Sequence, residues 1–194
     1  MTAADDYLEN NKGYALTHAG GLASPPSRHV AVVACMDARL DVTALLGLAN
    51  GEAHVIRNAG GAVTDDAIRS VAISQRLLGT TEVILIHHTD CGMVKFTEDG
   101  LKAEIERDTG IRPPWATEAF TDLDADVVQS IARLKASPFV PHTDKVRGFV
   151  FDIGTGLLRE VRLRRVRPRQ QSRRAWDGIP EGREAPAPAP NPPP

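Results

Sequence analysis

The chain has 194 residues, of which 42% are hydrophobic and 25% charged, and its formal net charge is −2. This composition is typical of an ordinary globular protein, and the length suits one domain with a sizeable core. No run approaches the roughly 18 apolar residues of a membrane span, and the polar start MTAADDYLENN lacks a signal-peptide pattern. We therefore expect a cytoplasmic protein with no membrane partner.

The charge is unevenly distributed. Residues 159–174 hold eight arginines and one acid (+7) and residues 175–194 carry −2, so residues 1–158 must carry −7. A nucleic-acid-binding protein would spread its basic residues over a folded face, so we expect no nucleic-acid partner.

Strand patterns alternate with helix patterns along the chain. Arg28–Cys35 and Glu82–His88 are apolar runs that predict buried strands. Ala53–Asn58 is a shorter strand candidate between them, and Arg147–Ile153 is a fourth strand. Leu157–Leu163 can return beside it as an antiparallel edge strand.

Two helices are indicated between these strands. After the breaker Ala59–Gly61, Thr64 is a good N-cap for a helix that Gly79 would end. Asp122–Ala136 has apolar residues on one side and predicts an amphipathic helix. Strands separated by helices imply an α/β fold with a mainly parallel sheet.

The chain changes character after Arg167. Eight of its fourteen prolines lie from Pro168 onward, a composition that cannot form a packed core. We predict one folded domain over residues 1–166 and an Arg/Pro-rich disordered tail over residues 167–194. The arginines could contact an acidic surface, but a solvated tail is the favoured interpretation.

The only two cysteines, Cys35 and Cys91, suggest a metal site. Without an export signal, a disulfide is disfavoured against metal binding or catalysis. Cys35 ends the first strand, and His88 and Cys91 straddle the end of the third, where sites form in parallel sheets. Two sulfurs and one imidazole suit zinc, and three ligands leave a position for water or substrate, as in catalytic sites.

Each signal taken alone has a simpler interpretation. Cys35 could be a small core residue, and the spacing H-x-x-C often occurs by chance. His87 should point to the other side of its strand and be packed or hydrogen-bonded. The other four histidines lie in segments without an evident route to the cluster: His18, His29, His54 and His142. The three donors at two strand ends together favour a metal.

Cys35, Asp37 and Arg39 form the pattern C-x-D-x-R. Alternate residues of an extended segment face the same way, so Asp37 can reach the metal or its water. Arg39 can hold that carboxylate in a bidentate pair. A D-x-R pair is usually a surface ion pair, but next to a metal ligand it is expected to orient groups around the metal.

ACMDARLD, RNAGG and HHTDCGM, in this order, resemble the β-class carbonic anhydrases, especially the short bacterial members. The likeness runs from about Asp6 to Leu163. It implies a four-stranded parallel core flanked by helices with an added antiparallel edge strand. It also implies a homodimer or a dimer of dimers, in which a helix over Asp6–Ala19 embraces the partner subunit.

The resemblance further implies a site. One Zn²⁺ per subunit would bind Cys35, His88 and Cys91, with Asp37 and Arg39 as the catalytic dyad. Substrate, CO₂ or bicarbonate, would meet the loop with Asn58, Ala59 and Gly60. Many members carry a substrate-contacting glutamine before the first strand, and GGLASPPSRH has none, so that contact is not carried over.

The implied enzyme is a carbonic anhydrase (carbonate dehydratase, a lyase). Zinc-bound hydroxide would hydrate carbon dioxide reversibly to bicarbonate and a proton. Three alternatives stay open: hydrolysis of carbonyl sulfide or carbon disulfide on the same scaffold, a non-enzymatic zinc-binding or regulatory domain, and a reversible Cys35–Cys91 disulfide.

Overall fold

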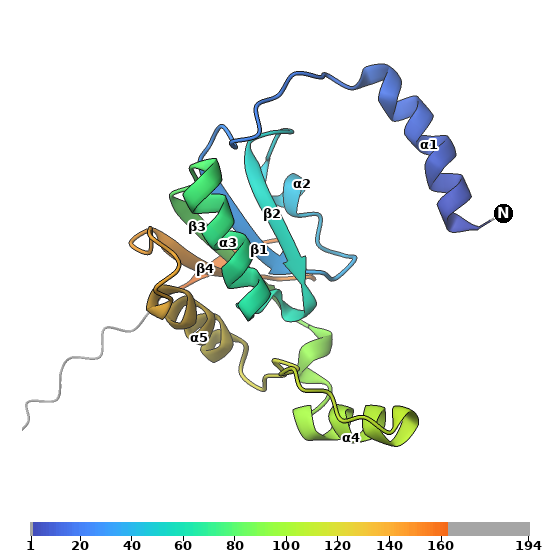
Figure 1. The fold of residues 1–194 in the computed structure, drawn as a ribbon, viewed down its shortest axis with the longest axis vertical. Helices are drawn as coiled ribbons and strands as arrows, with labels where there is room; N and C mark the ends of the chain where they lie inside the picture. Colours follow the sequence, from blue (N-terminus) through green and yellow to red (C-terminus); the bar gives the residue numbers. More distant parts are fainter. Residues whose placement is uncertain (1, 163–194) are drawn as a thin grey trace, which may run out of the picture. The chain divides into compact units, whose positions relative to one another are not determined.

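The computed structural model describes residues 2–162, and its centre is a five-stranded sheet of order β2-β1-β3-β4-β5 (Figure 1). Its strands, in chain order, are β1 (Val30–Cys35), β2 (Ala53–Asn58), β3 (Glu82–His88), β4 (Val146–Phe151) and β5 (Leu158–Val161). The first four are parallel, and β5 runs antiparallel to β4. The expected four-stranded parallel core with an antiparallel edge strand is confirmed.

The strand order brings the ligand-bearing strands together. β1 pairs with β2 on one side and with β3 on the other, and Ala34 lies opposite Ile86. Cys35 and His88 therefore end neighbouring parallel strands at the same edge of the sheet. Both strands are almost wholly buried, which agrees with their continuous apolar sequences.

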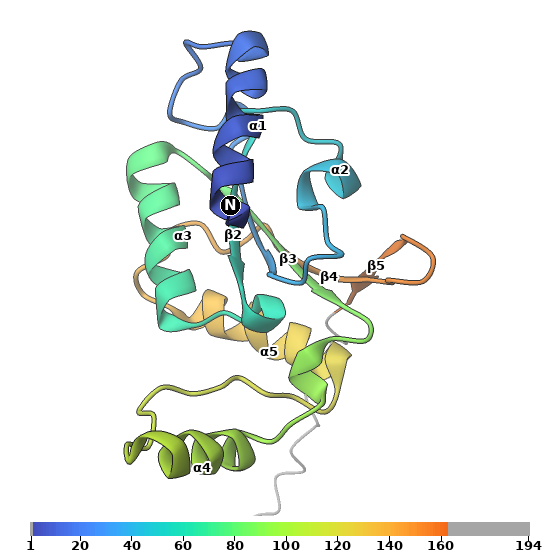
Figure 2. The ribbon, with the colours of Figure 1, turned by 90° about the vertical axis from the view of Figure 1, so that its right-hand side faces the viewer.

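Helices α3 (Asp65–Leu78) and α5 (Leu123–Ala136) cover one face of the sheet (Figures 1 and 2). α3 begins after the expected cap Thr64, whose side chain accepts a hydrogen bond from the third amide of the helix. Asp122, expected as the first residue of its helix, caps α5 in the same way. Gly79 ends α3 in the left-handed conformation at φ 71°. The core on this face joins residues of both helices to the sheet: Val33, Val71, Leu85, Val127, Ile131, Leu134 and Val150.

The opposite face carries α2 (Val42–Leu46), a single turn that the sequence analysis did not predict. Its cluster of buried residues includes both cysteines: Val32, Ala34, Cys35, Leu40, Val42, Ile86, Cys91, Met93 and Phe120. Two 3₁₀ turns, η1 (Ala59–Gly61) and η2 (Gly92–Val94), follow β2 and β3. The metal-ligand candidates thus belong to a packed core at one end of the sheet.

Two further helices bury no residue. α4 (Glu98–Thr109) was not predicted, and α1 (Ala3–Thr17) begins three residues before the expected Asp6 and ends before Ala19. Thr2 and Asp5 form a capping box, which explains the earlier start of α1. None of the described helices is both long and apolar enough to cross a membrane. The predicted tail over residues 167–194, with its boundary at 166, lies outside the described residues.

Candidate metal centre

The structure brings Cys35, His88 and Cys91 together. Their ligand atoms all lie within 4.8 Å of one another, and the two Sγ atoms are 4.0 Å apart. All three side chains are buried. Within residues 2–162 no other histidine, cysteine or acidic residues form such a group.

Local structure fixes the turn that carries two of these ligands. His88 is the last residue of β3, and Cys91 precedes η2. Between them, the Thr89 amide donates to the Phe151 carbonyl at 2.9 Å, and its hydroxyl accepts from the Ile153 amide at 3.0 Å. These bonds anchor the turn to β4 and its continuation.

The His88 ring is oriented as a metal ligand requires. Its Nδ1 lies 2.9 Å from the Thr89 carbonyl, an acceptor, so Nδ1 carries the proton and Nε2 is left with a lone pair. Nε2 is buried and has no hydrogen-bond partner in the protein. Because unpartnered buried nitrogens are costly, and metal-bound histidines usually donate their other N–H to such an oxygen, this arrangement fits a zinc ion.

The two thiols differ in their affinity for a proton. A hydrogen bond from the Cys91 thiol lowers the pKa of Cys35 to about 4 and raises the pKa of Cys91 above its usual range. Burial opposes a charge on His88, but the nearby Cys35 sulfur and the hydrogen bond with the Thr89 carbonyl give the ring a raised pKa. The lowered pKa favours the thiolate at Cys35, and a thiolate is the form of cysteine that binds a metal.

Asp37 and Arg39 form the bidentate pair expected from C-x-D-x-R. Arg39 Nε lies 2.9 Å from Asp37 Oδ1, and Nη2 lies 2.8 Å from Oδ2. These hydrogen bonds hold the pKa of Asp37 well below its usual range. Asp37 Oδ2 is 3.7 Å from His88 Nε2, so the carboxylate lies next to the metal-binding atoms.

Two residues of this site were missed by the sequence analysis. Asp90 receives a second hydrogen bond from the Arg39 guanidinium, at 2.9 Å. Arg57, at the end of β2, donates to the carbonyls of Cys35 and Asp37 at 2.9 and 2.6 Å. Asp90 stands inside the H-x-x-C motif and Arg57 is the first residue of the RNAGG motif, but only the folded structure shows what each side chain contacts.

The loop after β2 lies against the ligand strand. Asn58 pairs with Cys35, and its carbonyl accepts from the Met36 amide at 2.8 Å. A Cβ atom at Gly61, where φ is 72°, would lie only 2.8 Å from the Cys35 amide nitrogen and from the Ile86 carbonyl. This position requires glycine both for its backbone conformation and for the close approach.

The expected substrate loop also lines a hollow of about 390 Å³. Asn58 and Ala59 lie in its wall, and Gly60 is buried behind Met93. None of the three metal-ligand candidates lines this hollow, and the loop is placed near the cluster by the pairing of Asn58 with Cys35.

The remaining histidines lie away from the cluster, as expected. His87 is fully buried, with Nε2 3.2 Å from the Gly61 carbonyl and Nδ1 3.1 Å from Asp126. Phe120 stacks on its ring. His87 is therefore a packed, hydrogen-bonded residue.

Comparisons with known proteins identify the family of the chain. Residues 30–158 match the family model described as carbonic anhydrase. The chain is 60% identical over 161 residues to β-carbonic anhydrase 1 of Mycobacterium tuberculosis, covering 83% of this chain and 99% of that protein. It is 34% identical to a carbon disulfide hydrolase of Saccharolobus solfataricus, covering 82% and 89%.

A solved structure supports the same assignment. The carbonic anhydrase of Streptococcus mutans superposes with a TM-score of 0.78 at 42% identity, covering 84% of this chain and 99% of that one. The chain belongs to the β-carbonic anhydrase family.

Proposed function

We propose that this protein is a zinc-dependent carbonic anhydrase that interconverts carbon dioxide and bicarbonate. The observation that carries the proposal is the buried Cys35–His88–Cys91 cluster with the carboxylate of Asp37 beside it. A structural zinc site usually has four protein ligands, whereas three ligands with a neighbouring hydrogen-bond acceptor suit catalysis.

A zinc ion held by these three residues would lower the pKa of a bound water toward about 7 and supply hydroxide for attack on carbon dioxide. Asp37 contributes an acceptor that orients the attacking group, and it stays ionised because Arg39 lowers its pKa. Arg39 would also compete with a bound metal for that carboxylate. Asn58, Ala59 and Gly60 would shape the adjoining substrate pocket.

A second candidate reaction is hydrolysis of carbon disulfide or carbonyl sulfide. It is favoured by the 34% identical relative named carbon disulfide hydrolase. A carbon dioxide hydration assay run beside a sulfide-release assay tests the proposal. We expect fast hydration and little sulfide; the reverse result would make the protein a hydrolase, and zinc-loaded protein inactive in both assays would make it a non-enzymatic zinc domain.

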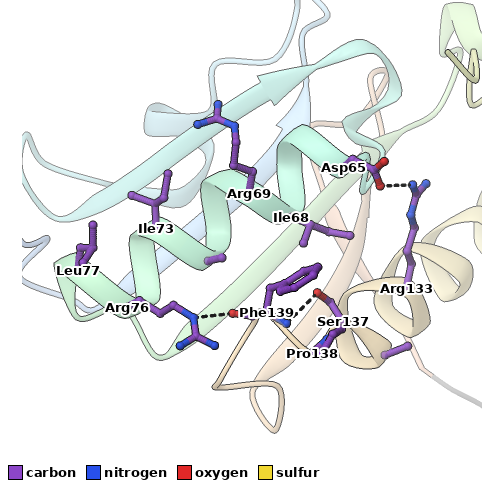
Figure 3. A pocket seen from close by; sticks show the side chains of 12 residues that line it. Asp65, Ile68, Arg69, Ile73, Arg76, Leu77, Arg133, Ser137, Pro138 and Phe139 are labelled. Carbon is purple, nitrogen blue, oxygen red and sulfur yellow. Dashed lines mark hydrogen bonds and ion pairs between the residues drawn. The ribbon is translucent and has the colours of Figure 1, made fainter. Parts of the chain in front are cut away.

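We also propose a homodimer, which can pair further into a dimer of dimers. Its support is an exposed helix and an exposed groove on the same chain. α1 buries no residue and exposes large apolar side chains: Tyr7, Leu8, Tyr14 and Leu16. Between α3 and α5 lies an apolar hollow of about 680 Å³ with Ile73, Leu77 and Phe139 exposed in its wall (Figure 3).

The two surfaces also carry charges of opposite sign, although Arg69 pairs with Asp66 and Glu9 with Lys12 in the single chain. Arg69 and Arg76 stand at the groove (Figure 3), and the first half of α1 carries Asp5, Asp6 and Glu9. Docking of α1 from a second copy into this groove would bury both apolar surfaces.

A cytoplasmic location completes the proposal. Its support is the pair of free, buried thiols 4.0 Å apart, which a reducing compartment keeps available for a metal.

A further inference from the structure

Asp90 lies between the metal-ligand candidates His88 and Cys91 in the sequence. Its carboxylate pairs with two positively charged side chains. Its Oδ2 accepts from Arg39 Nη1 at 2.9 Å, and Lys95 Nζ lies 3.1 Å from its Oδ1. Its backbone carbonyl also accepts from Arg39 Nη2, at 3.1 Å. Asp90 adopts φ 53°, in the left-handed region that aspartate and asparagine tolerate better than most residues.

Arg39 is therefore held by two acids on two sides. Nε and Nη2 bind the Asp37 carboxylate, while Nη1 and Nη2 bind Asp90. Asp37 follows the first metal ligand, and Asp90 lies between the other two, so the guanidinium bridges the two ligand-bearing loops. A planar guanidinium with one carboxylate can pivot about that pair, whereas a second carboxylate fixes its plane.

The orientation of Arg39 matters because Asp37 has a competing partner. Its Oδ2 lies 3.7 Å from His88 Nε2, so a small movement would bring the carboxylate to the metal. If Asp37 bound the metal, it would occupy the fourth coordination position, which the catalytic water or the substrate needs. Contacts that hold Arg39 against Asp37 keep the carboxylate from making that movement.

We propose that Asp90 is a positioning residue that acts through Arg39 to keep Asp37 from binding the metal. The inference rests on the proposed zinc enzyme and adds a third member to the Asp37–Arg39 pair. It does not require Asp90 to stabilise the fold. The Asp90 side chain is 58% exposed, and exposed ion pairs contribute little to stability.

The test compares Asp90→Asn with a matched control, Asp99→Asn. Asparagine keeps the size of Asp90 and tolerates its backbone conformation, but removes the charge that holds Arg39. Asp99 is an exposed aspartate of α4 that also pairs with an arginine, Arg112, at 2.9 Å. Azide affinity is measured by absorption on the cobalt-substituted protein, together with kcat for carbon dioxide hydration on the zinc protein.

If Asp37 occupies the metal in most molecules of Asp90→Asn, azide should bind about tenfold more weakly and kcat should fall by a similar factor. Asp99→Asn should match the unsubstituted protein in both measurements. In an Asp37→Asn background, where the competing carboxylate is gone, Asp90→Asn should leave azide affinity unchanged.

Unchanged azide affinity in Asp90→Asn, or an equal loss in the Asp37→Asn background, would overturn the inference. The proposed function fails separately: unsubstituted protein that takes up one metal ion and binds azide but hydrates no carbon dioxide would defeat it, and the azide comparison could still be made.

Discussion

Arg39 connects the two loops that together supply all three metal-ligand candidates. It forms four hydrogen bonds from its side chain, two to Asp37 and two to Asp90. Arg57 holds the backbone of the same region through the carbonyls of Cys35 and Asp37. The position of one carboxylate thus depends on residues from three segments of the chain.

Replacing Arg39 with alanine should free Asp37 to bind the metal. We expect Arg39→Ala to keep its zinc but to lose at least about tenfold in hydration kcat near neutral pH. Zinc content and kcat, measured on the same preparation, check this. Retained activity in this variant would show that Arg39 does not restrain Asp37.

The charge of the ligand set predicts a pH dependence. Two thiolates neutralise zinc more than three neutral histidines do, so the pKa of the catalytic water should lie above about 7. The active, deprotonated form then accumulates as pH rises, and hydration activity should increase from neutral to alkaline pH. Asp37 adds no transition in this range, because its pKa is lowered and it is already ionised. A flat profile of kcat/KM against pH would contradict the charge argument.

At the scale of elements, the packing of α5 on the sheet depends on a glycine in β4. Gly148 lies opposite Leu85 of β3 and Val161 of β5. A Cβ atom at this position would overlap Val127 and lie 2.9 Å from Ile131 Cδ1, both on α5. The helix can approach the sheet this closely only because residue 148 has no side chain.

Gly148→Ala should therefore destabilise the protein by about 1–3 kcal/mol through overpacking. Gly20→Ala is a suitable control, because Gly20 lies outside the helices and no heavy atom lies within 4 Å of the added Cβ. Urea unfolding of the two variants checks the difference. Equal stability of Gly148→Ala and the unsubstituted chain would show that α5 moves aside without cost.

Sequence patterns predicted the elements that have strong local signals. The buried runs of β1 and β3 and the caps Thr64 and Gly79 of α3 are examples, and all were found. α2 is a single turn, too short for a helical period, and α4 buries no residue and so has no apolar stripe. Their local signals were the capping residues alone: Asp41 and Gly47 for α2, and Thr97 and Gly110 for α4.

The same distinction applies to the site. The three ligands and the Asp37–Arg39 pair could be predicted, because they depend on short sequence spacings and on β1 lying next to β3. The contact between Arg39 and Asp90 joins residues 51 positions apart, and that between Arg57 and Cys35 joins residues 22 apart. Such contacts depend on the conformations of loops, and the hydrophobic periodicity of the sequence carries no information about them.

At the scale of the whole molecule, α1 and the groove between α3 and α5 both carry large exposed apolar side chains within residues 2–162. Leu8 of α1 is 68% exposed and Leu77 of the groove is 75% exposed. Exposed apolar surface of this extent is typical of an interface between subunits.

The proposed docking predicts that Leu8→Asp and Leu77→Asp each weaken the dimer. A buried charge at either position would lack a partner, so the dimer Kd should rise at least tenfold, about 1.4 kcal/mol. Sedimentation at several concentrations measures this, with Leu157→Asp, another exposed leucine outside both surfaces, as the control. Dimers of unchanged affinity in both variants would place the interface elsewhere.

The metal content of freshly purified, reduced protein tests the central claim most directly. Two thiolates and one imidazole that share an ion should hold one zinc per chain, and Cys91→Ser should lose most of it while the chain stays folded. Reduced protein without stoichiometric metal, or zinc retained in full by Cys91→Ser, would contradict the metal centre and the reaction built on it.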